Sequence, residues 1–63
     1  MYEIKKWICK PVLKEVIKTN LSYQELAENI VVLAGNINEE EFFNLYEIEN
    51  LETGKIYNKD FDL

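Results

Sequence analysis

The run at residues 21–27, Leu-Ser-Tyr-Gln-Glu-Leu-Ala, constrains the fold most because it carries a complete set of helix-start signals. Ser22 can accept a hydrogen bond from the backbone N–H of Glu25, and Glu25 can accept one from the backbone N–H of Ser22. Leu21 and Leu26 occupy the two positions of a hydrophobic staple across this capping box. The run therefore predicts that a helix begins directly after Ser22.

Two successive helices are predicted in the middle of the chain. The first runs from about Tyr23 to Ala34, because apolar residues recur at helical spacing until Gly35, a natural helix stop. Asn38 then supplies a second N-cap, and residues 39–41 place three glutamates in the next first turn, where negative charge suits the helix dipole. A further helix is therefore predicted from about Glu39.

The pattern at either end of the chain is less decisive. Residues 2–9 fit helical spacing and strand alternation almost equally, and we favour a helix. After Pro11, apolar residues at 12, 13, 16 and 17 form a two-on, two-off stripe that favours a helix. Residues 45–58 allow either a helix that stops at Gly54 or a β-hairpin around a turn at residues 52–55, and we favour the helix.

Size and residue types exclude several classes of protein. A chain of 63 residues predicts one domain, 1–63, with marginal stability that dimerisation would increase. A single cysteine, Cys9, and the absence of histidine exclude a disulfide framework and a Cys/His zinc site, and they predict a cytoplasmic protein. No apolar run approaches the ~20 residues that a membrane span needs. The sequence offers no activated nucleophile and no glycine-rich phosphate loop, so we expect no enzyme activity, cofactor or metal.

Charge is divided along the chain. Residues 1–20 contain five lysines and two glutamates, whereas residues 21–63 contain two lysines and ten acidic residues, for a total charge of −5. Every basic residue is lysine, which weakens any expectation of base-specific DNA reading, because bidentate recognition of guanine is mainly an arginine task.

Three stretches together resemble phage-repressor-type helix-turn-helix domains. Residues 13–20 look like the first helix and turn of that family, 21–27 like the start of its second helix, and 44–55 like its third helix. The resemblance departs from the family in an acidic insertion of about ten residues between the second and third helices. It implies an all-α bundle of about three to four helices, with the hairpin at about 45–58 as the alternative for the C-terminal part.

The resemblance also implies a small DNA-binding regulator. The start of the second helix would face a phosphate, the third helix would enter the major groove, and two lysines would contact phosphates. The residues that would bind DNA are Ser22, Tyr23, Gln24, Asn44, Tyr46, Asn50, Lys55 and Lys59.

The acidity of residues 21–63 supports an alternative function. The chain would then be a non-enzymatic protein-binding module, such as an inhibitor encoded by a phage or mobile element, that docks on a basic partner. Val32 is the exception on an otherwise polar helix face, so it would be either covered by the N-terminal segment or part of a dimer or partner contact. The residues of this interaction surface would be Val32, Glu39, Glu40, Glu41 and Phe43.

Overall fold

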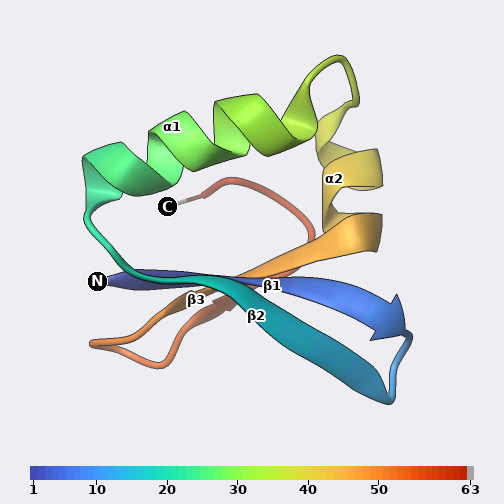
Figure 1. Cartoon of the computed structure of the whole chain (residues 1–63), viewed down its shortest axis with the longest axis horizontal. Helices are drawn as coiled ribbons and strands as arrows, with labels where there is room; N and C mark the ends of the chain where they lie inside the picture. Colours follow the sequence, from blue (N-terminus) through green and yellow to red (C-terminus); the bar gives the residue numbers. More distant parts are fainter. Residues whose placement is uncertain (63) are drawn as a thin grey trace.

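The computed structural model describes residues 1–62, and it shows an α+β fold with helices on one side of an antiparallel sheet (Figure 1). The sheet has four strands in the order β2–β1–β3–β4. Two helices separate the first pair of strands from the last pair. In chain order the elements are β1 (Tyr2–Cys9), β2 (Leu13–Leu21), α1 (Tyr23–Ala34), α2 (Glu39–Leu45), β3 (Tyr46–Asn50) and β4 (Ile56–Tyr57).

The prediction of an all-α bundle is wrong, and so is the helix-turn-helix resemblance, because residues 2–21 form a β-hairpin. The apolar stripe at residues 12–17 predicts the buried face of a helix. In the structure these residues lie on the edge strand β2 and in the turn before it, and Val12, Leu13 and Val16 are 83%, 52% and 51% exposed. Of the four residues of the stripe, Ile17 alone packs against the core, so the stripe does not mark a buried face.

Both predicted helix starts are confirmed. The Ser22 hydroxyl accepts from the backbone N–H of Glu25 at 3.1 Å, and the Glu25 carboxylate accepts from the backbone N–H of Ser22 at 3.0 Å. The side chain of Asn38 accepts from the backbone N–H of Glu41 at 2.8 Å at the start of α2. Gly35 ends α1 with a positive φ of 55°, which glycine adopts without steric cost.

Loss of the Ser22 cap is expected to lower the free energy of unfolding by about 1 kcal/mol in Ser22→Ala, because the N–H of Glu25 loses its acceptor. Ser22→Thr is the matched control, since threonine keeps the hydroxyl and should cost only a small part of that. Urea unfolding followed by circular dichroism measures both. Equal stability of the alanine variant and the native chain would contradict the capping role.

The same cap makes a prediction about pH. The hydrogen bond from the backbone N–H of Ser22 lowers the pKa of Glu25 below its ordinary value. Because the pKa of Glu25 is lower in the folded state than in the unfolded state, the ionised side chain stabilises the fold at pH values above the unfolded pKa. This contribution is lost as the pH falls through the folded-state pKa. The difference in stability between the native chain and Glu25→Gln should therefore shrink on acidification. A difference that stays constant from neutral pH to about pH 3 would contradict it.

At the C-terminal end the hairpin alternative is correct and the favoured helix is wrong. Helix α2 stops at Leu45, because the following residues alternate in polarity and pair with β1, with Ile48 opposite Ile4. Strand β4 then pairs with β3, with Tyr57 opposite Ile48. Gly54 closes the turn between them with a φ of 76° and donates its backbone N–H to the carbonyl of Asn50.

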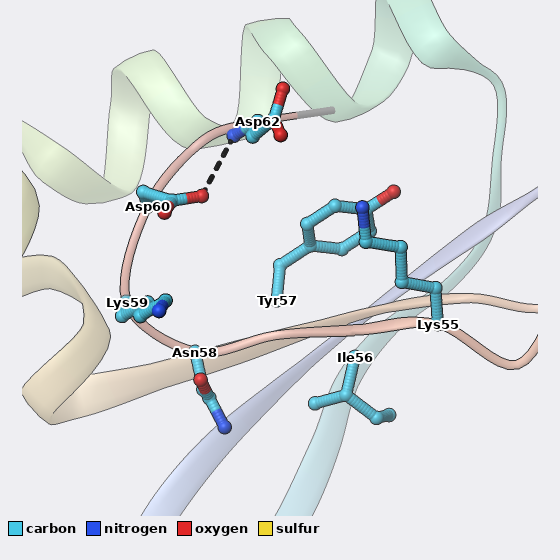
Figure 2. Close-up of a pocket in the computed structure, with 7 residues that line it drawn as sticks. All are labelled: Lys55, Ile56, Tyr57, Asn58, Lys59, Asp60 and Asp62. Atoms are coloured by element: carbon cyan, nitrogen blue, oxygen red, sulfur yellow. Dashed lines mark hydrogen bonds between the residues drawn. The ribbon is translucent and has the colours of Figure 1, made fainter.

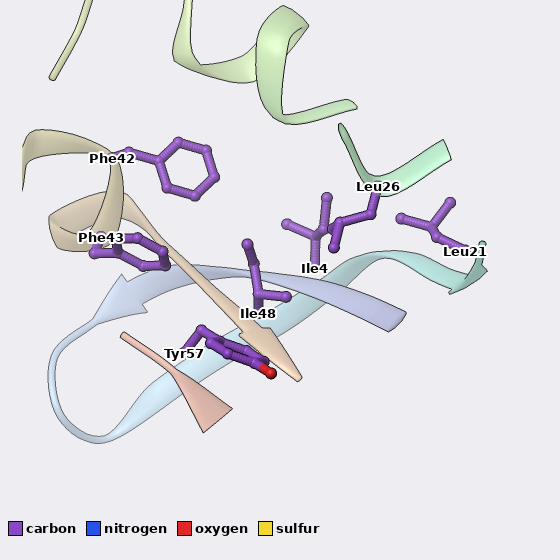
Figure 3. Packing of buried hydrophobic residues seen from close by; sticks show 7 residues of the cluster. All are labelled: Ile4, Leu21, Leu26, Phe42, Phe43, Ile48 and Tyr57. Carbon is purple, nitrogen blue, oxygen red and sulfur yellow. The ribbon is translucent and has the colours of Figure 1, made fainter. Parts of the chain in front are cut away.

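The core lies between the sheet and the helices (Figure 3). Both layers contribute to it, and α2 supplies two adjacent phenylalanines although it is short. Phe61, from the C-terminal segment, packs against both of these rings at centroid distances of 5.1 and 4.8 Å. The buried apolar residues are Ile4, Leu21, Leu26, Phe42, Phe43, Ile48 and Tyr57.

Candidate protein-binding surface

The residues predicted to bind DNA do not form one surface. Ser22, Tyr23 and Gln24 begin α1 as expected, but residues 44–55 run from the end of α2 through β3 into a turn, so there is no recognition helix there. Tyr46 is half-buried with its ring 4.9 Å from that of Phe42. The side chain of Asn50 accepts from two backbone N–H groups in the β3–β4 turn. The third-helix groove contact implied by the resemblance is therefore wrong.

Charge is separated between the layers of the fold. Residues 22–45, which contain both helices, include five glutamates and no lysine. The β1–β2 hairpin contains five of the seven lysines and two glutamates. One side of this small molecule is thus acidic, and the lysines that would offset its charge belong mostly to the opposite layer.

Ion pairs in residues 1–62 are confined to the sheet and the N-terminus. Lys5 has its pKa raised by its hydrogen bond to Glu49, an effect that outweighs partial desolvation of the ammonium. The ion pairs are Lys5–Glu49 at 2.8 Å, Lys5–Glu3 at 3.5 Å, Lys14–Glu47, and the N-terminal amine with Glu52 at 2.9 Å. Among these residues, no glutamate of the helices has a cationic partner.

The helix glutamates differ in what else they contact. Glu25 belongs to the capping box, Glu39 accepts from the backbone N–H of Phe61 at 3.1 Å, and Glu41 accepts from the Asn38 side chain at 3.4 Å. Glu28 and Glu40 have no hydrogen-bond partner within residues 1–62. Their carboxylates are free to meet a ligand from outside the chain.

Two valines lie one turn beyond Glu28 on the outer side of α1. The core side of the helix is formed by Leu26, Ile30 and Leu33, and this spacing leaves Val31 and Val32 73% and 80% exposed. The N-terminal segment therefore does not cover Val32, and the interpretation of Val32 as a covered residue is wrong. Val31 was missed because the sequence interpretation singled out only one valine on this face.

The connector at residues 35–38 brings the end of α1 and the start of α2 to one end of the molecule (Figure 1). We call the surface that runs from the middle of α1 to the start of α2 the acidic corner and define it by Glu28, Val31, Val32, Glu39 and Glu40. Glu41 lies in the same first turn of α2 and remains exposed. Phe43, predicted as an exposed contact, is only 2% exposed and belongs to the core, so that prediction is wrong.

A cavity of about 310 Å³ lies elsewhere, between β4 and the C-terminal segment (Figure 2). The ammonium of Lys55 lies 4.9 Å from the centre of the Tyr57 ring, and the backbone N–H of Asp62 donates to the side-chain carboxylate of Asp60. One segment, residues 55–62, supplies all of its lining residues, and these include two lysines and two aspartates, so the cavity has no net charge of one sign. In residues 1–62 there is no group of three or more potential metal ligands, and no helix is long and apolar enough to cross a membrane.

Fold and surface together define a small two-layer α+β domain with an acidic helical layer. No protein-family model, curated protein or solved structure gives a significant match to this chain. The function must therefore be argued from the chemistry of the surface.

Proposed function

We propose that this chain is a non-enzymatic protein-binding module whose acidic corner docks on a basic partner. The observation that carries this proposal is the combination, on the helical layer, of carboxylates without cationic partners and exposed valines. Two neighbouring valines that are 73% and 80% exposed are unusual on a helix face that contacts only water.

The two components of the corner have different roles in binding. Carboxylates of one sign without counter-charges create a local negative potential, which attracts a cationic partner and orients its approach. The valines supply contact energy, since burying both would contribute on the order of 2–4 kcal/mol. The matching partner surface presents lysine or arginine side chains around a small apolar centre, as a basic amphipathic helix or a basic hairpin does.

A defined cationic probe tests the proposal. We expect a fluorescent amphipathic peptide of lysine and leucine to bind the native chain, and the variant E28Q/E40Q/V32S to bind it at least ~10-fold more weakly, a loss of about 1.4 kcal/mol. Fluorescence anisotropy at low protein concentration and moderate salt measures the affinity. A glutamate–leucine peptide of the same length should not bind.

The matched control removes the same groups from another place. Glu15, Glu52 and Val16 are exposed and lie outside the helical layer, so E15Q/E52Q/V16S changes net charge and exposed valine equally. It should weaken binding less than about 2-fold. An equal loss of peptide affinity in both variants would mean that binding depends only on net charge, and it would contradict a site at the acidic corner. So would absence of peptide binding, or tighter binding of a short DNA duplex than of the peptide.

A further inference from the structure

The tip of the β1–β2 hairpin extends beyond the rest of the sheet. Strand β3 pairs with β1 only at residues 2–6, so the stretch from Trp7 to the start of β2 has no third strand beside it. We define the hairpin tip by Ile8, Lys10, Val12 and Leu13. Its three apolar side chains are 55%, 83% and 52% exposed, which is unusual for one short turn.

The tip is also basic. Lys10 has no carboxylate partner within residues 1–62, and its ammonium donates to the backbone carbonyl of Phe43 at 3.1 Å. The same ammonium lies 5.6 Å from the centre of the Trp7 ring. These contacts hold the Lys10 ammonium at the end of the molecule that α2 occupies, and neither contact neutralises its positive charge.

The tip lies at the end of the molecule that also holds α2 and the end of α1, and so most of the acidic corner (Figure 1). The corner has unpaired carboxylates beside exposed valines, and the tip has an unpaired ammonium beside exposed aliphatic side chains. The two surfaces therefore match each other in charge and in apolar character. In a two-fold dimer joined at this end, each tip would contact the other copy's corner.

We propose that the acidic corner binds the hairpin tip of a second copy, so that the chain forms a two-fold dimer with two identical tip-to-corner contacts. This inference rests on the proposed function, because it names a partner for the same corner. A dimer of this kind covers the corner, so self-association and binding of an external basic partner compete.

Interface size sets the expected strength of the dimer. A standard interface buries about 800 Å² per partner, close to a fifth of the 4269 Å² surface of this chain. One end of a molecule measuring 26 × 26 × 19 Å offers less than that, so the dimer should be weak and should dissociate as salt screens the charge pairs.

Sedimentation velocity over a concentration series, at low and moderate salt, tests the inference. The native chain should shift from monomer to dimer with concentration, and more strongly at low salt. The tip variant K10Q/V12S/L13S and the corner variant E28Q/E40Q/V32S should each remain monomeric, because each loses both contacts of the dimer. Their equimolar mixture should dimerise again, more weakly than the native chain, since one intact tip and one intact corner remain.

A control at the β3–β4 turn, which lies at the end of the molecule away from α2 (Figure 1), is K55Q/L51S/I56S; it removes comparable exposed groups and should still dimerise. A native chain that stays monomeric throughout would overturn the inference, as would self-association that the tip variant does not reduce or a mixture that shows no dimer. The lysine–leucine peptide separates the two proposals. Peptide binding without self-association would overturn the dimer alone, whereas loss of both would overturn the proposed function as well.

Discussion

Phe42→Ala is expected to lower the free energy of unfolding by about 3–5 kcal/mol, most of the stability of a domain this size. Phe42 has no exposed surface, and its ring lies 5.1 Å from those of Phe43 and Phe61 and 4.9 Å from that of Tyr46. Truncation leaves a cavity that three rings cannot fill without moving. Helix α2 would lose its main anchor, and the acidic corner would lose the glutamates that α2 presents.

Urea unfolding monitored by circular dichroism measures this loss, with Leu45→Ala as the control on the same helix. Leu45 is 46% exposed, so its truncation should cost well under half as much. Phe42→Leu should fall between the two, because it retains part of the buried volume. A cost near 1 kcal/mol for Phe42→Ala would show that this ring is not the centre of the core.

The second large effect is expected at the ion pair between Lys14 and Glu47. Glu47 is only 5% exposed, on the side of the sheet away from the helices, and Lys14 is its cationic partner. Lys14→Met leaves a nearly buried carboxylate without a counter-charge. Loss of one partner from a fully buried pair costs about 3–5 kcal/mol, and because Lys14 itself is about one-third exposed we expect roughly 1–3 kcal/mol.

The double variant K14M/E47Q separates this effect from simple loss of packing. Removing both charges should recover much of the stability, because a neutral amide is far less costly to bury than an unpaired carboxylate. Lys18→Met is the control, since Lys18 lies on the same strand, is exposed and has no ion pair within residues 1–62. Equal destabilisation of the single and double variants in urea unfolding would contradict an electrostatic origin.

Sequence reasoning succeeded where the deciding contacts are local. The capping boundaries at Ser22, Gly35 and Asn38 depend on groups within about four residues, and all three are found as predicted. The strands depend on partners that are distant in the sequence, such as Ile4 opposite Ile48. Alternation in residues 2–9 is too short to decide between helix and strand without that partner, which explains the wrong fold class.

The candidate surface was predictable only in part. Val32 and the glutamates at 39–41 were identified because a charge run and an apolar exception on a polar helix face are visible in sequence. Phe43 was misplaced because α2 buries two adjacent phenylalanines, which helical spacing alone does not require. The hairpin tip could not be recognised as a surface, since its exposure follows from a strand pairing that the sequence pattern left undecided.

The most direct test of the proposed function is an amide NMR titration of the native chain with the lysine–leucine peptide, at a protein concentration below self-association. The acidic corner predicts that the largest shift changes fall on residues 28–32 and 39–41, with little change in the β3–β4 turn. Changes that are largest on the hairpin or in the β3–β4 turn, or that spread evenly over all charged residues, would contradict binding through the helical layer.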